Sequence, residues 1–237
     1  MLGRGLTESR EKAQALILAG EVYVDGQKAL KPGQPVVAAT QIQINQPLRY
    51  VSRGGLKLEG ALNHFSISVQ GRVCLDVGTS TGGFADCLLQ RGAARVHCVD
   101  TGLGQIDWKL RTDPRIILHE KTNARYLEPA VIGEQPSLIV CDVSFISVTL
   151  ILPAVTALLA PGGELVILVK PQFEVGRDFV GKGGIVRDPR QQQGACDRVA
   201  ALLNELGFAT QLMESPILGM EGNREFLLHG SRQNPSN

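Results

Sequence analysis

The chain has 237 residues, 43% hydrophobic and 20% charged, a composition typical of a globular protein with one large domain or one medium and one small domain. The net charge is only +1, which excludes binding to nucleic acid through a strongly basic overall charge. The charge is uneven, because residues 1–57 carry eight basic and four acidic side chains, or +4, and the remaining residues carry 16 and 19, or −3. A small basic segment therefore precedes a slightly acidic body.

The first elements in chain order predict a small module. Residues 9–20 have an apolar stripe that predicts a helix, with Ser9 as its N-cap. The stretch EVYVDGQ predicts a short strand with an Asp-Gly turn, and PVVAATQIQI predicts another alternating strand. We expect an α+β domain over residues 1–45 and a linker over residues 46–53, before the helix LKLEGALNHF.

From Val73 onward, apolar runs alternate with helical stretches. Continuous apolar runs, typical of a parallel sheet covered on both faces, predict strands near 73–77, 95–99, 115–118, 138–142 and 164–170. A helix opening at Asp188-Pro189 and a final antiparallel pair complete the pattern. It predicts an α/β fold over residues 54–237, with the Rossmann-like sheet of S-adenosyl-methionine-dependent methyltransferases. The glycine-rich segment 171–188 lacks periodicity and predicts a functional loop.

Cysteine spacing and hydropathy indicate the compartment. The start of the chain lacks a signal-peptide pattern, and the apolar stretch 145–169 is broken by Pro153 and by Pro161-Gly162-Gly163, so we expect no membrane span. No C-x-x-C pair or metal spacing occurs, and we expect no bound metal. We interpret the cysteines as buried thiols in a reducing cytoplasm: Cys74, Cys87, Cys98, Cys141 and Cys196.

The stretch CLDVGTSTGGFADCLLQRGAARVHCVD predicts a strand, a glycine turn, a helix and a second strand that ends in an acid. A dinucleotide fingerprint needs G-x-G-x-x-G, but Ser80 stands at the second glycine position, which favours a ligand without a pyrophosphate, such as S-adenosyl-methionine. Asp100 is placed to accept both ribose hydroxyls, and Asp76 to meet the ligand's amino group directly or through water. A purely structural turn is the alternative.

Longer motifs carry a resemblance. The stretches SRGGLKL, LDVGTSTGGFADCLLQRGA, VDTGLGQ, RTDPRI, KTNARYL, DVSFIS, LVKPQFEVGR, GGIVRDP and EGNREFLL are similar to those of the TlyA/hemolysin-A-like family. The resemblance covers nearly the whole chain. It implies a ribose 2′-O-methyltransferase acting on ribosomal RNA, with an FtsJ-like catalytic domain after an RNA-binding domain of the ribosomal-S-four type.

The resemblance also implies site residues. The family's catalytic Lys-Asp-Lys-Glu set falls on Lys57, Asp142, Lys170 and Glu225. Cofactor positions fall on Asp76, Gly78, Ser80, Gly82, Gly83 and Asp100, with Asn123 beside the adenine. The expected RNA-binding residues are basic side chains of the N-terminal segment: Arg4, Arg10, Lys12, Lys28 and Arg53.

The resemblance implies a cytidine target within a ribosomal subunit. Family members usually begin with about ten more residues, so this chain opens inside their first helix. The short forms of the family are associated with the large ribosomal subunit alone. We therefore expect the large subunit as the target, with the small subunit as the alternative.

The chemistry restricts the roles that these residues can have. A sugar hydroxyl is a very weak acid, so the base must be strong, and a lysine accepts a proton only as the neutral amine. Lys170 could be this base, with Lys57 as a second charge that favours the neutral form. Asp142 and Glu225 would orient the two lysines, although their negative charges oppose that effect. The alternatives are that both lysines are solvated surface groups and that Asp142 caps the following helix.

Two other functions compete with this interpretation. Methylation at carbon 5 of a base needs a cysteine nucleophile, typically after a proline or threonine, and no cysteine of this chain has that setting. Methylation of a base nitrogen typically uses the motif Asn/Asp-Pro-Pro-aromatic, whereas this chain has Asp142-Val143-Ser144-Phe145. A non-enzymatic cytolysin, suggested by the hemolysin name, would need a spanning or amphipathic pore-forming segment, which the sequence does not show.

Overall fold

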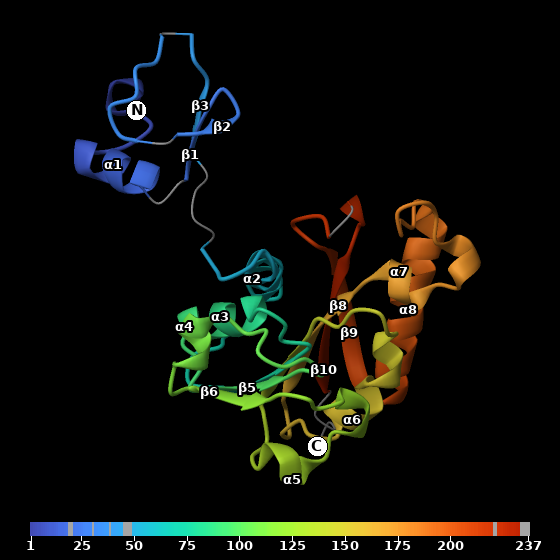
Figure 1. Cartoon of the computed structure of the whole chain (residues 1–237). Coiled ribbons are helices and arrows are strands. Elements are labelled where there is room, and N and C mark those ends of the chain that lie inside the picture. Colours follow the sequence, from blue (N-terminus) through green and yellow to red (C-terminus); the bar gives the residue numbers. More distant parts are fainter. Residues whose placement is uncertain (19–20, 30, 38, 45–48, 220–221, 233–237) are drawn as a thin grey trace. The chain divides into compact units, whose positions relative to one another are not determined.

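The N-terminal unit is a small antiparallel sheet with one helix. The structure, a computed structural model, describes residues 1–18, 21–29, 31–37, 39–44, 49–219 and 222–232 (Figure 1). The chain forms two units, 1–49 and 50–237. The first contains η1 (Leu2–Arg4), α1 (Arg10–Leu18) and a sheet of order β2-β1-β3, formed by β1 (Val22–Val24), β2 (Gln27–Lys28) and β3 (Ile42–Ile44).

The local signals in this unit act as the sequence predicts. Ser9 Oγ accepts a hydrogen bond from Lys12 N at 3.1 Å, which satisfies a free amide at the start of α1. Asp25 and Gly26 form the turn between β1 and β2 with φ of 48° and 79°, the left-handed region that Asp and Gly tolerate best. These residues therefore form the predicted helix start and strand turn.

The second unit is built on a seven-stranded sheet of order β6-β5-β4-β7-β8-β10-β9. β10 is antiparallel to β8 and β9, and the other pairs are parallel. The chain order reverses between β4 and β7, and ligands of such sheets bind at this switch point. The strands are β4 (Val73–Val77), β5 (Arg95–Val99), β6 (Ile116–His119), β7 (Leu138–Cys141), β8 (Glu164–Val169), β9 (Phe208–Glu214) and β10 (Phe226–Arg232).

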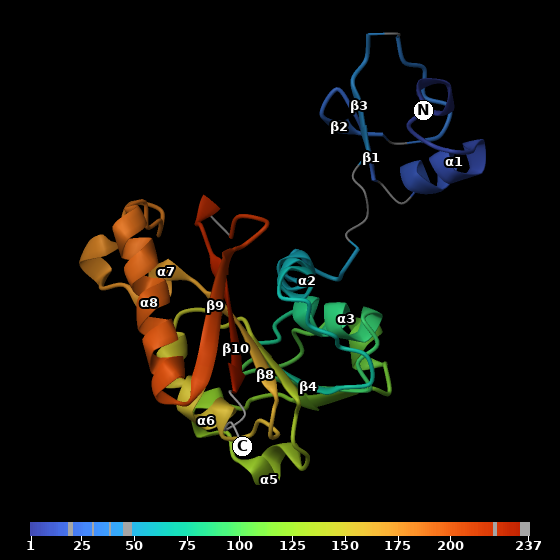
Figure 2. The same cartoon turned by 180° about the vertical axis from the view of Figure 1, so that it is seen from behind.

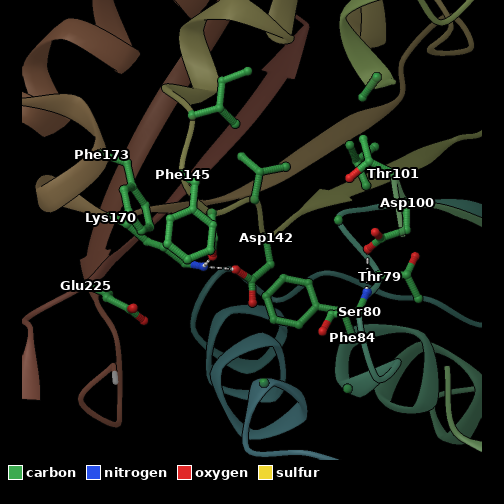
Figure 3. Close-up of a pocket in the computed structure, with 18 of the residues that line it drawn as sticks. Thr79, Ser80, Phe84, Asp100, Thr101, Asp142, Phe145, Lys170, Phe173 and Glu225 are labelled. Carbon is green, nitrogen blue, oxygen red and sulfur yellow. Dashed lines mark hydrogen bonds and ion pairs between the residues drawn. The ribbon is translucent and has the colours of Figure 1, made fainter. Parts of the chain in front are cut away.

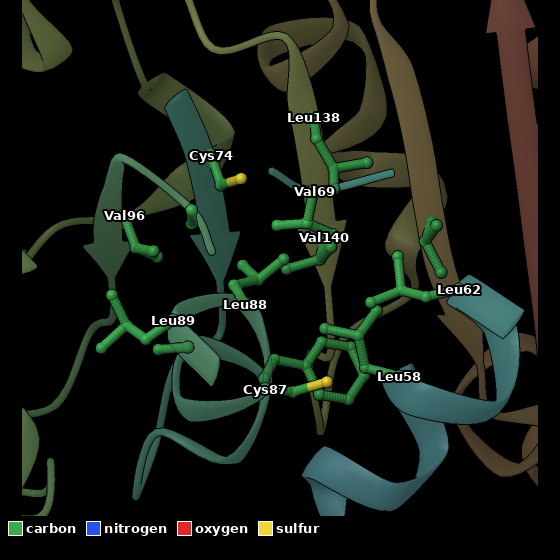
Figure 4. Close-up of a cluster of buried hydrophobic side chains, with 14 of the residues drawn as sticks. Leu58, Leu62, Val69, Cys74, Cys87, Leu88, Leu89, Val96, Leu138 and Val140 are labelled. Carbon is green, nitrogen blue, oxygen red and sulfur yellow. The ribbon is translucent and has the colours of Figure 1, made fainter. Parts of the chain in front are cut away.

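Helices cover both faces of this sheet (Figures 1 and 2). Alternate residues of each strand point to opposite faces, so Cys74 and Leu75 of β4 belong to two different core clusters. The first cluster contains α2 and α3 (Figure 4), and the second contains α6 and α8. The helices are α2 (Gly54–His64), α3 (Gly83–Gln90), α4 (Trp108–Arg111), α5 (Pro129–Ile132), α6 (Leu152–Thr156), α7 (Pro171–Glu174) and α8 (Pro189–Glu205), with short η2 (Ala124–Tyr126), η3 (Val148–Leu150) and η4 (Arg177–Phe179).

Residues 50–53 of the expected linker 46–53 instead form part of the second unit, which corrects that boundary. Tyr50 is 2% exposed and belongs to the first core cluster. Val51 N donates to Asp86 Oδ2 at 2.9 Å, which ties this segment to α3. A side chain at Gly55 would collide with the Tyr50 ring, so only glycine permits this approach. Residues 46–48 of the expected linker lie outside the described residues.

The five cysteines are buried, as the sequence predicts. All five are free, and burial raises the pKa of the Cys74 thiol to about 12. Within the described ranges no helix is long and apolar enough to cross a membrane. The same residues contain no group of three or more His, Cys, Asp or Glu side chains arranged to hold a metal ion.

Candidate active site

A cavity of about 980 Å³ lies at the carboxyl ends of β4, β5, β7 and β8. These strand ends meet at one edge of the sheet, where polar residues that follow each strand converge (Figure 3). Ten of the sequence-predicted site residues line this cavity: Arg53, Lys57, Gly78, Ser80, Gly83, Asp100, Asn123, Asp142, Lys170 and Glu225.

The glycine turn after β4 shapes one wall. Ser80 adopts φ of 51°, the left-handed conformation that a glycine would take at this position in a dinucleotide fingerprint. A side chain at Gly78 would collide with the carbonyl oxygen of Asp142, and one at Gly83 with Ser52 Oγ. The glycines therefore allow the turn to lie close to both β7 and the segment before α2.

Asp100 holds this turn in place. Its two carboxylate oxygens accept hydrogen bonds from Ser80 N and Gly102 N, both at 2.7 Å. A carboxylate oxygen has two lone pairs, so each can still accept a hydroxyl proton. Asn123 lines the same cavity, while its Oδ1 accepts from Arg125 N at 3.0 Å and caps η2.

Two predicted cofactor residues do not reach the cavity. Asp76 is fully buried at 0% exposure beneath the turn. A side chain at Gly82 would collide with Leu110, so Gly82 allows helix packing rather than ligand contact. Asp76 is the penultimate residue of β4 and its side chain is fully buried, a placement that an acid near a strand end does not reveal. Any effect of Asp76 on a ligand is therefore indirect.

Burial makes Asp76 unusual. Burial first, and then the neighbouring Asp142 and Asp100 carboxylates, raise the pKa of Asp76 to about 8. Between its ordinary value near 3.8 and about 8, the folded protein keeps a proton that the unfolded chain has lost. The contribution of Asp76 to stability is therefore complete below pH 4 and is lost as the pH rises through about 8.

Asp76→Asn should remove this loss. We expect the free energy of unfolding of the variant, relative to the wild type, to rise from pH 5 to pH 8 by up to about 1.4 kcal/mol per pH unit and then to level off. Urea titrations of the ligand-free proteins at each pH measure this difference. A difference independent of pH would contradict the proposed protonation of Asp76.

The four expected catalytic residues form two ion pairs in the cavity wall. Lys170 Nζ lies 2.5 Å from Asp142 Oδ1, and Lys57 Nζ lies 2.5 Å from Glu225 Oε2. Both lysines are 9% exposed and Glu225 is 3% exposed, so the interpretation as solvated surface lysines is wrong. Asp142 pairs with Lys170, the residue after β8 (Figure 3).

Local structure brings Lys57 and Glu225 together. Lys57 lies in the first turn of α2, and Glu225 immediately precedes β10, 168 residues later. A side chain at Gly219 would collide with the Glu225 carboxylate, so this glycine leaves the space in which the carboxylate lies. Two buried lysines, each held by a carboxylate, can act on a weakly acidic hydroxyl by removing its proton or by stabilising the oxygen anion.

Sequence reasoning missed an aromatic pair and a serine in this site. Phe145 is 93% exposed at φ of 65°, and its ring lies 5.3 Å from the ring of Phe173. Ser144 Oγ accepts a hydrogen bond from Lys170 Nζ at 2.7 Å. The signal was available, because Phe145 and Ser144 belong to the stretch DVSFIS and Phe173 to VKPQFE.

Sheet order, cavity position and the two buried lysine–carboxylate pairs define an α/β methyltransferase. The FtsJ-like methyltransferase profile matches residues 50–232, and the S4 domain profile matches residues 4–42. The chain therefore belongs to the FtsJ-like methyltransferase family and carries an N-terminal S4 domain, which confirms the resemblance and the predicted fold class.

Proteins of similar sequence match this chain along nearly its whole length. YqxC of Bacillus subtilis, named as a candidate rRNA methyltransferase, is 48% identical over 97% of this chain and 83% of its own length. The 16S/23S rRNA (cytidine-2′-O)-methyltransferase TlyA of Mycobacterium tuberculosis is 46% identical over 96% of this chain and 86% of its own. A solved structure of a hemolysin-named protein from Streptococcus thermophilus is 45% identical, with a TM-score of 0.78 over 97% of this chain and 85% of that one.

Asp100→Ala should weaken the binding of S-adenosyl-methionine by about 1–3 kcal/mol, because the ribose hydroxyls lose their acceptor. Isothermal titration calorimetry measures the change. Asp113→Ala is the matched control, since Asp113 pairs with Arg115 and lies outside the cavity lining. Unchanged cofactor affinity in the Asp100 variant would refute the assignment.

Proposed function

We propose that this protein transfers the methyl group of S-adenosyl-methionine to the ribose 2′-hydroxyl of a cytidine in ribosomal RNA. The observation that carries the proposal is the pair of buried ion pairs, Lys170–Asp142 and Lys57–Glu225, in one cavity. The name of the TlyA relative supports the same reaction and the same nucleotide. Because the proposed substrate is ribosomal RNA, we propose that the protein acts in the cytoplasm.

The residues that line the cavity suit S-adenosyl-methionine. Asp100 and the Gly78–Gly83 turn would hold the ribose and the adjoining part of the ligand, and Asn123 would lie beside the adenine. No wide pyrophosphate cradle is present, because Ser80 stands where a second glycine would be. When bound, S-adenosyl-methionine supplies a methyl group activated by its sulfonium.

The chain's own residues would handle the proton. In this proposal Lys170, as the neutral amine, accepts the 2′-hydroxyl proton, and Asp142 orients its nitrogen. Lys57 contributes positive charge beside the developing oxygen anion, and Glu225 holds Lys57 in place. The low exposure of both lysines strengthens these interactions.

The alternative functions find little support. None of the five cysteines, all within the described residues, lines the cavity, so base methylation through a cysteine nucleophile lacks its nucleophile. Dye release from vesicles tests the cytolysin alternative directly, and we expect none above a buffer control.

We assign residues 1–45 to RNA binding and residues 50–237 to catalysis, because residues 50–53 of the expected linker 46–53 belong to the second unit. Arg10, Lys12 and Lys28 are exposed. Arg4 instead donates to the carbonyls of Thr40 at 2.5 Å and Val37 at 3.0 Å, which gives it a role in the fold of the module.

Reversing the charges of Arg10 and Lys12 to glutamate should weaken RNA binding and reduce the log–log salt slope by about one unit per lost phosphate contact. Cofactor affinity, measured in parallel, should not change. Filter binding of ribosomal RNA across a salt series is the measurement. An unchanged affinity and slope would remove these two residues from the RNA interface.

Transfer of labelled methyl groups to purified subunits tests the proposed function itself. We expect incorporation into RNA of the large subunit, with the small subunit assayed beside it. No incorporation into either subunit or into free ribosomal RNA would overturn the proposal.

A further inference from the structure

We propose that Ser144 is a positioning residue for methyl transfer, because it fixes the orientation of the Lys170 amine toward the acceptor hydroxyl. This inference rests on the proposed function, in which Lys170 is the base. Ser144 belongs to the stretch DVSFIS but is not one of the four catalytic positions that the resemblance implies.

The contacts around Lys170 leave one side of its nitrogen open. Lys170 Nζ lies 2.5 Å from Asp142 Oδ1 and donates to Ser144 Oγ at 2.7 Å. On a further side the Phe173 ring centroid lies 6.0 Å away, too far for a hydrogen bond. Asp142, Ser144 and Lys170 all line the cavity, so we take the remaining side of the nitrogen to face the space that the substrate would occupy. Figure 3 shows Lys170 and Asp142 pointing toward each other in this wall.

The spacing of the two acceptors explains why both face the same lysine. Asp142 and Ser144 follow β7 and are two residues apart, the spacing at which side chains of extended backbone point to one side. Phe145 then takes φ of 65°, which turns the chain away directly after Ser144. The loop thus presents two neighbouring groups to Lys170, the Asp142 carboxylate as its ion-pair partner and the Ser144 hydroxyl as its hydrogen-bond acceptor.

Two acceptors are what a neutral amine needs to act as an oriented base. A neutral lysine nitrogen carries two N–H bonds and one lone pair. If Asp142 and Ser144 each accept one N–H, the lone pair must take the third position, toward the cavity. With Asp142 alone, the second N–H and the lone pair can exchange places by rotation about the Cε–Nζ bond. Ser144 therefore selects the productive orientation.

The proton balance of the step is simple. The 2′-oxygen forms a bond to the methyl carbon as the carbon–sulfur bond of the sulfonium breaks, and the hydroxyl proton passes to the Lys170 lone pair. Lys170 then carries three N–H bonds, two of which remain on Asp142 and Ser144. Because charged donors form the stronger hydrogen bonds, the Ser144 contact stabilises the protonated product more than the neutral amine.

Ser144→Ala should lower kcat about 3- to 10-fold, the fold-change that corresponds to one hydrogen bond. Cofactor affinity and the KM for RNA should not change. The midpoint of the pH–rate profile should move to lower pH, because the variant loses an acceptor that favours the ammonium form. The other charged groups lining the same cavity are Arg53, Lys57, Asp100, Asp142 and Glu225, and all five remain in the variant.

Ser144→Thr keeps the hydroxyl and should restore kcat to within about threefold of the wild type. Thr149→Ala is the matched control, since it removes a hydroxyl bonded to Ser147 just beyond this loop, outside the cavity lining. It should leave kcat and the pH midpoint unchanged.

Single-turnover methylation of the RNA substrate at saturating cofactor, from pH 6 to pH 10, is the experiment. A Ser144→Ala enzyme with wild-type kcat and pH midpoint, or a Thr variant as impaired as the Ala variant, would overturn the inference. If the wild type itself methylates no ribose, the proposed function fails instead, so the two failures are distinguishable.

Discussion

Lys170→Arg should lower turnover at least ~10²-fold, the typical contribution of a general base, while cofactor and RNA binding remain nearly intact. Arginine keeps the positive charge but is effectively never deprotonated, so it cannot accept the hydroxyl proton. The wild-type rate should rise with pH, because the neutral amine is the active form. Single-turnover rates from pH 6 to pH 10 and calorimetric cofactor titrations measure both effects.

The rival role for Lys170 is purely electrostatic, as a positive charge beside the developing oxygen anion. That role predicts substantial residual activity in the arginine variant. A Lys170→Arg enzyme within a few-fold of the wild type, or a wild-type rate independent of pH with chemistry limiting, would remove Lys170 from the base role. A thermal denaturation curve of each variant separates lost chemistry from lost folding, since Lys170 is only 9% exposed.

Breaking the Lys57–Glu225 pair should cost about 3–5 kcal/mol of unfolding free energy, because either single substitution leaves an uncompensated buried charge. The pair lies at 2.5 Å with Glu225 3% exposed, so water compensates only in part for the missing partner. We expect this cost in Lys57→Met and in Glu225→Leu, and a smaller cost in the double variant than the sum of the two.

Alkylation of the five buried cysteines during urea titration reports unfolding of the second unit, since all of them lie there. Arg224→Ala is the matched control for this measurement. Arg224 lies next to Glu225 in sequence but forms an exposed pair with Glu214, with side chains 51% and 46% exposed. Its loss should cost at most about 1 kcal/mol. Equal costs for Arg224→Ala and Glu225→Leu would contradict the importance of burial.

The sequence predicts the sheet well because its strands are continuous apolar runs. Val73–Val77 and Leu138–Cys141 are almost entirely buried, and such runs between turn residues have few other interpretations. Asp100 was also predictable as a cavity residue, since the carboxyl ends of parallel strands meet at one edge. These features depend on local pattern and on a general rule of topology.

Other features depend on tertiary packing that no local pattern encodes. Asp76 and Asp100 both end apolar runs, yet one is fully buried and the other lines the cavity. The Lys57–Glu225 contact joins residues 168 positions apart, so only the resemblance pointed to it. Tyr50 likewise reaches the core because Gly55 has no side chain to block its ring. The sequence shows both residues but not their contact.

Nucleoside mass analysis of ribosomal RNA after reaction with labelled cofactor tests the central claim most directly. Subunits that lack the modification are incubated with the wild-type protein, with the Lys170→Arg variant as the inactive control, and the RNA is digested to nucleosides. We predict the label in 2′-O-methylcytidine, with the methyl group on the ribose fragment, and almost none with the variant. Label on a base fragment, or no label with the wild-type protein, would contradict the account.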